Sequence, residues 1–150
     1  MSNLFYCENK KSLSIKWDDL VSDINKLYTY NKFCYKKDYY SIFKHIIHSM
    51  LLGEEIVLLD SDYTEVELRR NIGFHEFSKF TKEVEPINCG SINKYQLIER
   101  LRNVNKKWQI TLFTSGTTGE PKKNIHNFES LTRFVKISDY RKDDIWGFAF

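Results

Sequence analysis

Residues 33–60 read FCYKKDYYSIFKHIIHSMLLGEEIVLLD, and this stretch determines the expected fold. Residues 33–35 and 55–60 are short apolar runs, and the second is bounded by charges, as expected of a strand buried on both faces. Gly53 stands where the C-terminal cap of the intervening helix belongs. The connection is long enough for a parallel crossover, so we predict a strand–helix–strand unit. The helix is indicated by apolar residues at helical spacing: Tyr39, Ile42, Phe43, Ile46, Ile47, Met50 and Leu51.

On the N-terminal side, residues 11–15 alternate between polar and apolar, which predicts a short strand. On the C-terminal side, Thr64 and Glu67 form a capping box for a short helix that Gly73 closes. Between the predicted strand at 11–15 and the one at 33–35, a further helix is predicted from the spacing of Trp17, Leu20, Val21, Ile24, Leu27 and Tyr28.

The rest of the chain keeps the alternation of strands and helices. Asn93 caps a predicted helix that buries Leu97, Ile98 and Leu101. Residues 108–113 predict a strand, a helix follows from about Asn127, and residues 144–150 predict another strand. Residues 74–92 show no pattern that assigns them. The order of elements predicts an α/β fold in which helices flank a layered, parallel-type sheet.

Composition excludes several classes of protein. The length of 150 residues fits one domain, and 41% hydrophobic residues with a net charge of +3 exclude a disordered chain. The charges are interspersed, which argues against a nucleic-acid partner. The N-terminus has no signal-peptide pattern, and no apolar run is long enough to span a membrane. Three sparse cysteines, Cys7, Cys34 and Cys89, fit a reducing cytoplasmic location and form no zinc pattern.

Residues 114–122 read TSGTTGEPK and carry the clearest chemical signal. They lie between a predicted buried strand and a predicted helix. Gly116 and Gly119 allow backbone angles that turn amides toward an anion. Lys122 adds a mobile positive charge suited to phosphate, and the following helix N-terminus could add its dipole. Hydroxyl donors come from Thr114, Ser115, Thr117 and Thr118, so we expect a polyphosphate ligand.

This loop differs from the two common phosphate loops. A Walker A loop places four residues between its first glycine and a Gly-Lys-Ser/Thr triplet, whereas two residues separate Gly116 from Gly119. The dinucleotide pattern Gly-x-Gly-x-x-Gly is also not met.

The loop resembles the phosphate-binding signature of the adenylate-forming (AMP-binding) superfamily, which includes acyl-CoA synthetases, luciferases and peptide-synthetase adenylation domains. Residues 114–122 match every fixed position of Thr-Ser-Gly-Thr-Thr-Gly-x-Pro-Lys. At roughly 6% per residue type, eight fixed positions recur by chance with odds on the order of 10⁻¹⁰ per site. His126 is similar to a histidine that often follows this motif. Many members have glycine after the motif lysine, where this chain has Lys123.

The resemblance implies an ATP-dependent ligase that joins a carboxylic acid to AMP and releases pyrophosphate. It implies that ATP binds with Mg²⁺ through its phosphates, and that coenzyme A or an acyl carrier protein supplies an acceptor thiol. The phosphate-binding residues would be Thr114, Ser115, Gly116, Thr117, Thr118, Gly119 and Lys122, with His126 as a further candidate.

Family members are several times longer than this chain, and their later elements bind adenine, ribose and magnesium. The resemblance therefore implies that residues 1–150 are an incomplete N-terminal portion of the domain, inactive alone in adenylation. Two alternatives remain open: a stand-alone module that binds nucleotide phosphates or docks on a partner, and a truncated copy without function.

Other polar residues are assigned structural roles. His45 and His48 share the amphipathic helix without a carboxylate or cysteine at suitable spacing, so a metal site is not expected there. His75 is isolated. Asp60 and Asp62 follow a predicted strand, and a strand-end turn explains them better than a ligand site.

Overall fold

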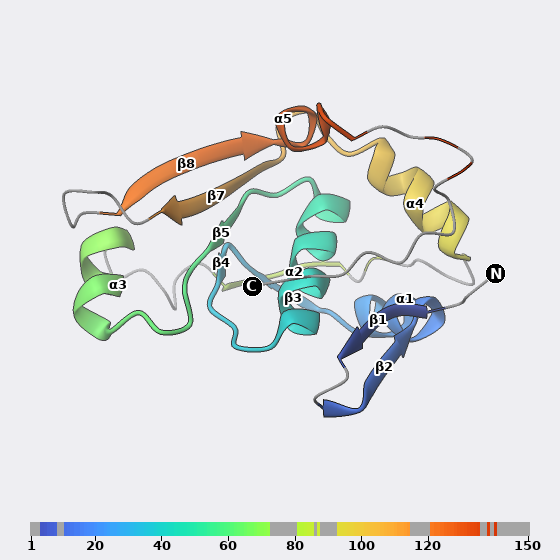
Figure 1. The fold of residues 1–150 in the computed structure, drawn as a ribbon, viewed down its shortest axis with the longest axis horizontal. Helices are drawn as coiled ribbons and strands as arrows, with labels where there is room; N and C mark the ends of the chain where they lie inside the picture. Colours follow the sequence, from blue (N-terminus) through green and yellow to red (C-terminus); the bar gives the residue numbers. More distant parts are fainter. Residues whose placement is uncertain are drawn as a thin grey trace.

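Figure 1 presents a computed structural model of the chain, which describes residues 4–8, 11–72, 81–85, 87, 93–114, 121–135, 138 and 140. Phe33 pairs in parallel with Val57, and Ile56 pairs in parallel with Ile110. The predicted strand–helix–strand unit is therefore confirmed. The main sheet has the order β4 (Phe33–Cys34), β5 (Ile56–Leu58), β7 (Gln109–Thr114) and β8 (Lys122–Asn127), and α2 (Tyr39–Leu52) makes the crossover.

The sheet is mixed, which corrects the expectation of a parallel-type sheet. β8 runs antiparallel to β7 with Thr114 opposite Lys122 and Gln109 opposite Asn127. Only a short loop joins these strands, and a parallel connection needs a crossover of a dozen or more residues. The coarser prediction, an α/β fold with helices flanking a sheet, is confirmed.

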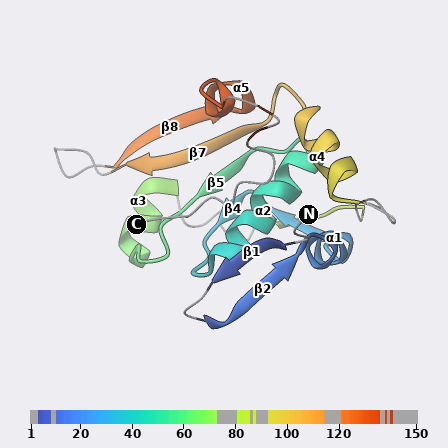
Figure 2. The same cartoon turned by 45° about the vertical axis from the view of Figure 1, so that its right-hand side comes forward.

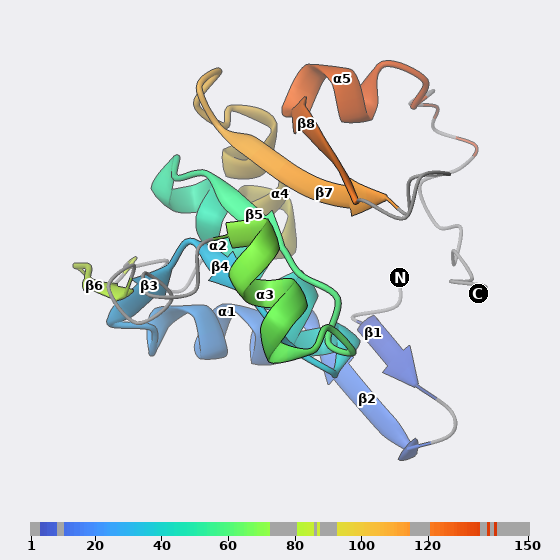
Figure 3. The same cartoon turned by 90° about the vertical axis from the view of Figure 1, so that its left-hand side faces the viewer.

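Each strand sends alternate side chains to the two faces of the sheet, as its period of two requires. Phe33 and Val57 pack with Leu68 of α3 (Glu65–Ile72) on one face. Cys34 and Ile56 pack on the other face, where partly buried side chains of α2 cover them. In Figures 1 and 3, α3 and α2 accordingly lie on opposite sides of β4 and β5. The core is therefore divided between two layers.

A third cluster joins the N-terminal segment to α2. β1 (Leu4–Glu8) and β2 (Leu13–Lys16) form an antiparallel hairpin next to α1 (Trp17–Asn25). Figure 2 shows this hairpin at the opposite end of the molecule from β7 and β8. A two-stranded sheet of β3 (Thr29–Asn31) and β6 (Thr81–Glu83) lies outside the predicted elements. The buried members of the cluster are Leu20, Val21, Ile24, Tyr40 and Leu97, the last from α4 (Lys94–Arg102).

The predicted helix starts are confirmed by their caps. The Thr64 amide donates to Glu67 Oε2 at 2.7 Å, and the Glu67 amide donates back to Thr64 Oγ1 at 3.3 Å. Asn93 Oδ1 accepts from two amides at the start of α4. Asn127 caps α5 (Phe128–Thr132) in the same way. The predictions for Gly73, for residues 74–80 and 88–92 and for the strand at 144–150 fall outside the described residues.

Gly53 ends α2 in the left-handed conformation with φ of 69°. A Cβ at this position would lie 3.2 Å from Asn105 Cβ. Gly53→Ala should therefore lower the free energy of unfolding by about 1–2 kcal/mol, because an alanine is strained there and crowds Asn105. Urea unfolding followed by circular dichroism measures this loss. Gly53→Asn is the control, since asparagine tolerates this conformation better, and equal losses for both variants would contradict the backbone argument.

Among the described residues, no helix combines the length and the apolar character needed to cross a bilayer.

Candidate functional site: the ends of the 114–122 loop

The signature loop connects two paired strands. Thr114 is the last residue of β7 and Lys122 is the first residue of β8, and the two are register partners. Both residues are exposed, and Pro121 beside them is partly exposed. The predicted ligand residues between them, Ser115, Gly116, Thr117, Thr118 and Gly119, lie outside the described residues.

Three polar side chains at the loop ends share one face of the hairpin. Directly opposite residues of an antiparallel pair point to the same face, and so do residues two apart on one strand. Thr114, Lys122 and Asn124 are related in this way. Asn124 Nδ2 donates to Thr114 Oγ1 at 3.0 Å and to the carbonyl oxygen of Lys122 at 3.3 Å. The structure thus brings together two predicted phosphate ligands, through a residue that was not predicted.

The helix predicted from about Asn127 is present as α5, but a strand that was not predicted separates it from the loop. β8 follows the loop, and α5 begins only at Phe128, at the far end of β8 in Figure 1. Five residue steps along a strand separate Asn127 from Lys122, which is about 17 Å. The Asn127 side chain also occupies the first turn of α5. The dipole of α5 therefore does not act at Lys122, the described end of the loop.

His126 lies on β8 opposite Ile110. It faces the same side as Lys122, but four residue steps separate them, which is about 13 Å of strand. The structure does not bring His126 to the described loop ends.

The loop leaves the sheet at the edge where all three parallel strands end. β4 ends at Cys34, β5 at Leu58 and β7 at Thr114, so the segments after them gather at this carboxyl edge. Open α/β sheets bind ligands at this edge. Two of the three segments are joined by Tyr35, whose hydroxyl donates to the carbonyl oxygens of Ser61 and Tyr63 at 2.9 and 3.0 Å.

The turn after β5 explains the two aspartates, as predicted. Asp60 Oδ1 accepts the Asp62 amide at 2.9 Å, and the Asp60 carbonyl accepts the Tyr63 amide at 3.1 Å. Among the described residues, no group of three or more His, Cys, Asp or Glu side chains could hold a metal ion.

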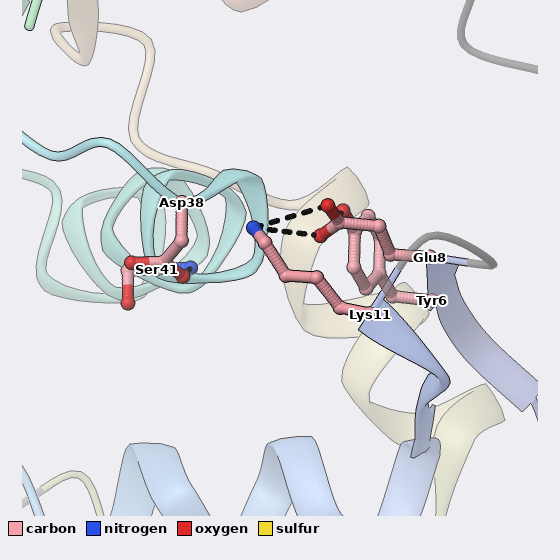
Figure 4. A network of polar contacts seen from close by, with 5 residues as sticks. All are labelled: Tyr6, Glu8, Lys11, Asp38 and Ser41. Carbon is pink, nitrogen blue, oxygen red and sulfur yellow. Dashed lines mark hydrogen bonds and ion pairs between the residues drawn. The ribbon is translucent and has the colours of Figure 1, made fainter.

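Both helix N-termini at the carboxyl edge already have a carboxylate partner. Asp38 Oδ1 accepts the Ser41 amide at 2.8 Å at the start of α2, and Glu67 serves the start of α3. Figure 4 shows Asp38 near Lys11, whose ammonium group pairs with Glu8 at 3.0 Å. Partial burial raises the pKa of Asp38, but the hydrogen bonds from Ser41 and the Lys11 charge outweigh it, so the net pKa is lowered. An anion at either helix N-terminus would compete with these carboxylates, whereas an anion beside Lys122 would not.

The structure describes the surroundings of three of the remaining candidates, Cys34, His45 and His48. Burial raises the pKa of the Cys34 thiol to about 11, so Cys34 is no activated nucleophile. His45 Nε2 contacts the carbonyl oxygen of Asn31 at 2.6 Å. His48 is buried, and its Nε2 has no hydrogen-bond partner among the described residues. Cys89 and His75 lie outside the described residues.

Sequence reasoning missed Asn124 because it missed β8. Residues 122–127 read KKNIHN, which has neither apolar alternation nor a hydrophobic run. Its one aliphatic residue, Ile125, is 53% exposed, so burial leaves no mark on this strand's sequence.

No family model matches this chain, and no curated protein or solved structure matches it either.

Proposed function

We propose that the chain is the N-terminal portion of an adenylate-forming ligase and that it supplies the ATP phosphate-binding loop. One observation carries the proposal: the match of residues 114–122 to the superfamily signature at every fixed position. The location of the loop supports it, since Thr114 and Lys122 stand together at the carboxyl edge of parallel strands.

In this proposal the enzyme forms an acyl-adenylate. A carboxylate oxygen of the acid bonds to the α-phosphorus of ATP, the α–β phosphoanhydride bond breaks, and its electron pair leaves with pyrophosphate. The sulfur of a thiol of coenzyme A or an acyl carrier protein then bonds to the acyl carbon. The bond from that carbon to the phosphate oxygen breaks, its electron pair leaves with AMP, and the thiol proton goes to solvent. The acid is a small molecule, and the reducing cytoplasm fits the sparse cysteines.

The described residues at the loop act on the phosphates. The Lys122 ammonium group would hold the β- and γ-phosphates and offset the charge that builds on the leaving pyrophosphate. Thr114 would donate its hydroxyl hydrogen to a phosphate oxygen. Mg²⁺ prefers oxygen ligands, and phosphate oxygens provide them, so it would arrive with the nucleotide.

Lys122→Ala should weaken MgATP binding by about tenfold to hundredfold, because it removes a charged donor from the phosphates. Lys123→Ala is the matched control: it removes the same charge one residue further on, from the opposite face of β8. A screened surface charge predicts a change of about threefold or less for that control. Titration calorimetry of the two variants and the unchanged chain measures both effects, and equal losses would contradict the assignment of Lys122.

The exchange of labelled pyrophosphate into ATP distinguishes phosphate binding from adenylation. We expect the 150-residue chain to show no exchange with a mixture of carboxylic acids, since the proposal gives it the phosphate loop only. Exchange by this chain would contradict that division of roles. MgATP binding that is tight and lost in Lys122→Ala, without exchange in any longer form of the protein, would favour the stand-alone binding module instead.

A further inference from the structure

We propose that Asn124 is a positioning residue that holds Thr114 and Lys122 against each other so that both act on one polyphosphate; this role rests on the function proposed above. The evidence is the pair of hydrogen bonds from Asn124 Nδ2, at 3.0 Å to Thr114 Oγ1 and at 3.3 Å to the Lys122 carbonyl oxygen. One side-chain amide therefore joins the last residue of β7 to the first residue of β8.

The chemistry of the partners fixes how the Asn124 amide is oriented. The Lys122 carbonyl oxygen can only accept, so the atom facing it is the NH₂ group. An NH₂ group has two hydrogens, and the two acceptors use one each. The second of these acceptors is the Thr114 hydroxyl oxygen. Asn124 thus needs its amide nitrogen, and an isosteric residue without this donor would not replace it.

The bond to Thr114 also sets what the threonine offers to a ligand. A hydroxyl group has one hydrogen to donate and two lone pairs to accept with. Because Asn124 takes a lone pair of Oγ1, the hydroxyl hydrogen is left for an acceptor such as a phosphate oxygen. Asn124 therefore biases Thr114 toward the donor role that an anion requires.

The bond to the Lys122 carbonyl oxygen acts at the end of a strand ladder. Thr114 and Lys122 are the last register pair of β7 and β8, and the terminal pair of a ladder opens most readily. Asn124 bonds within β8 to the Lys122 carbonyl oxygen and across to Thr114 on β7, and the two bonds together keep the backbone of Lys122 beside Thr114. The ordering is then complete before the ligand binds, which reduces the entropy cost of binding.

The test compares Asn124→Ala with Ile125→Ala in the 150-residue chain. Ile125 is the neighbouring residue of β8 on the opposite face, and it is exposed, so its variant controls for a weakened strand. Titration calorimetry with MgATP should show about tenfold weaker binding for Asn124→Ala, as expected for two lost hydrogen bonds, and little change for Ile125→Ala. Unfolding in urea, measured in parallel, confirms that each variant is folded.

A double-mutant cycle with Thr114 separates positioning from strand stability. In a Thr114→Val background, which lacks Oγ1, Asn124→Ala should cost clearly less affinity than in the unchanged chain. In a Thr114→Ser background, which keeps the hydroxyl, the full loss should return. Equal losses of affinity for Asn124→Ala and Ile125→Ala would overturn the role of Asn124 but not the proposed function. The same holds if the losses of affinity for Asn124→Ala and Thr114→Val simply add. Failure of the unchanged chain to bind MgATP would overturn the proposed function and this role together.

Discussion

Replacement of Trp108 by alanine is expected to lower the free energy of unfolding by about 3–5 kcal/mol, the usual cost of removing a buried tryptophan. Trp108 is 1% exposed and packs with Cys34, Ile56 and Ile110 between the sheet and α2. A domain of ordinary stability has about 5–15 kcal/mol in total, so the variant should be close to unfolding at room temperature. Urea unfolding followed by circular dichroism gives the loss directly.

The hydrogen bond of Trp108 needs its own variant. The indole Nε1–H donates to Ser49 Oγ at 3.0 Å, and the Ser49 hydroxyl donates to the Ile46 carbonyl oxygen at 2.7 Å. Ser49→Ala keeps the tryptophan packed but leaves its buried donor unpaired, which costs about 1–3 kcal/mol. A loss for Trp108→Ala no larger than for Ser49→Ala would show that packing around the indole contributes little.

His48 is expected to make the fold sensitive to acid. Its side chain is buried, and Nε2 has no hydrogen-bond partner in the part of the chain that the structure describes. Burial, followed by the nearby charge of His45, lowers the pKa of His48 from 6.5 to about 4. Below pH 6.5 the unfolded chain gains a proton that the folded chain does not, so acid favours unfolding. Stability should be fully present above pH 6.5 and fall by up to about 3 kcal/mol as the pH approaches 4.

The variant His48→Phe isolates this effect. Phenylalanine can keep the edge contact that His48 makes with the Tyr30 ring, whose centroid lies 5.8 Å away, and it has no proton to gain. Urea unfolding of both proteins at several pH values between 4 and 7 gives the slope of the free energy of unfolding against pH. The contribution of the carboxylates is common to both proteins, so it cancels in the difference between the two slopes. His45 also has a pKa lowered by burial, so part of the acid sensitivity should remain in the variant. Parallel pH profiles for the two proteins would contradict the assignment to His48.

The sequence predicted elements where burial leaves a periodic mark. The α2 helix, its Gly53 cap and the β4–β5 crossover follow from apolar spacing, and the caps at Thr64 and Asn93 follow from local hydrogen bonding. β3 and β6 were not predicted because each has three residues, too few to show alternation. β8 was not predicted because its pairing with β7, and not its own composition, determines that it forms a strand.

The candidate site was predicted in part for the same reason. Thr114 and Lys122 belong to a motif that can be read along the chain, and the structure places them as register partners. Asn124 has no place in that motif, and its contact with Thr114 arises only when the hairpin forms. The dipole that the following helix could have added does not act at Lys122, because β8, which residues 122–127 gave no pattern to predict, lies between Lys122 and Phe128.

The polar composition of β8 also bears on how the molecule behaves at high concentration. β8 is an edge strand of the main sheet in the part of the chain that the structure describes, with β4 at the other edge. Open strand edges invite pairing with a second molecule, and lysines on such an edge oppose it because like charges would meet. Lys122 and Lys123 are the first two residues of β8, and both are exposed. The lysine charge for which we propose a role in phosphate binding is therefore also expected to oppose self-association at this edge.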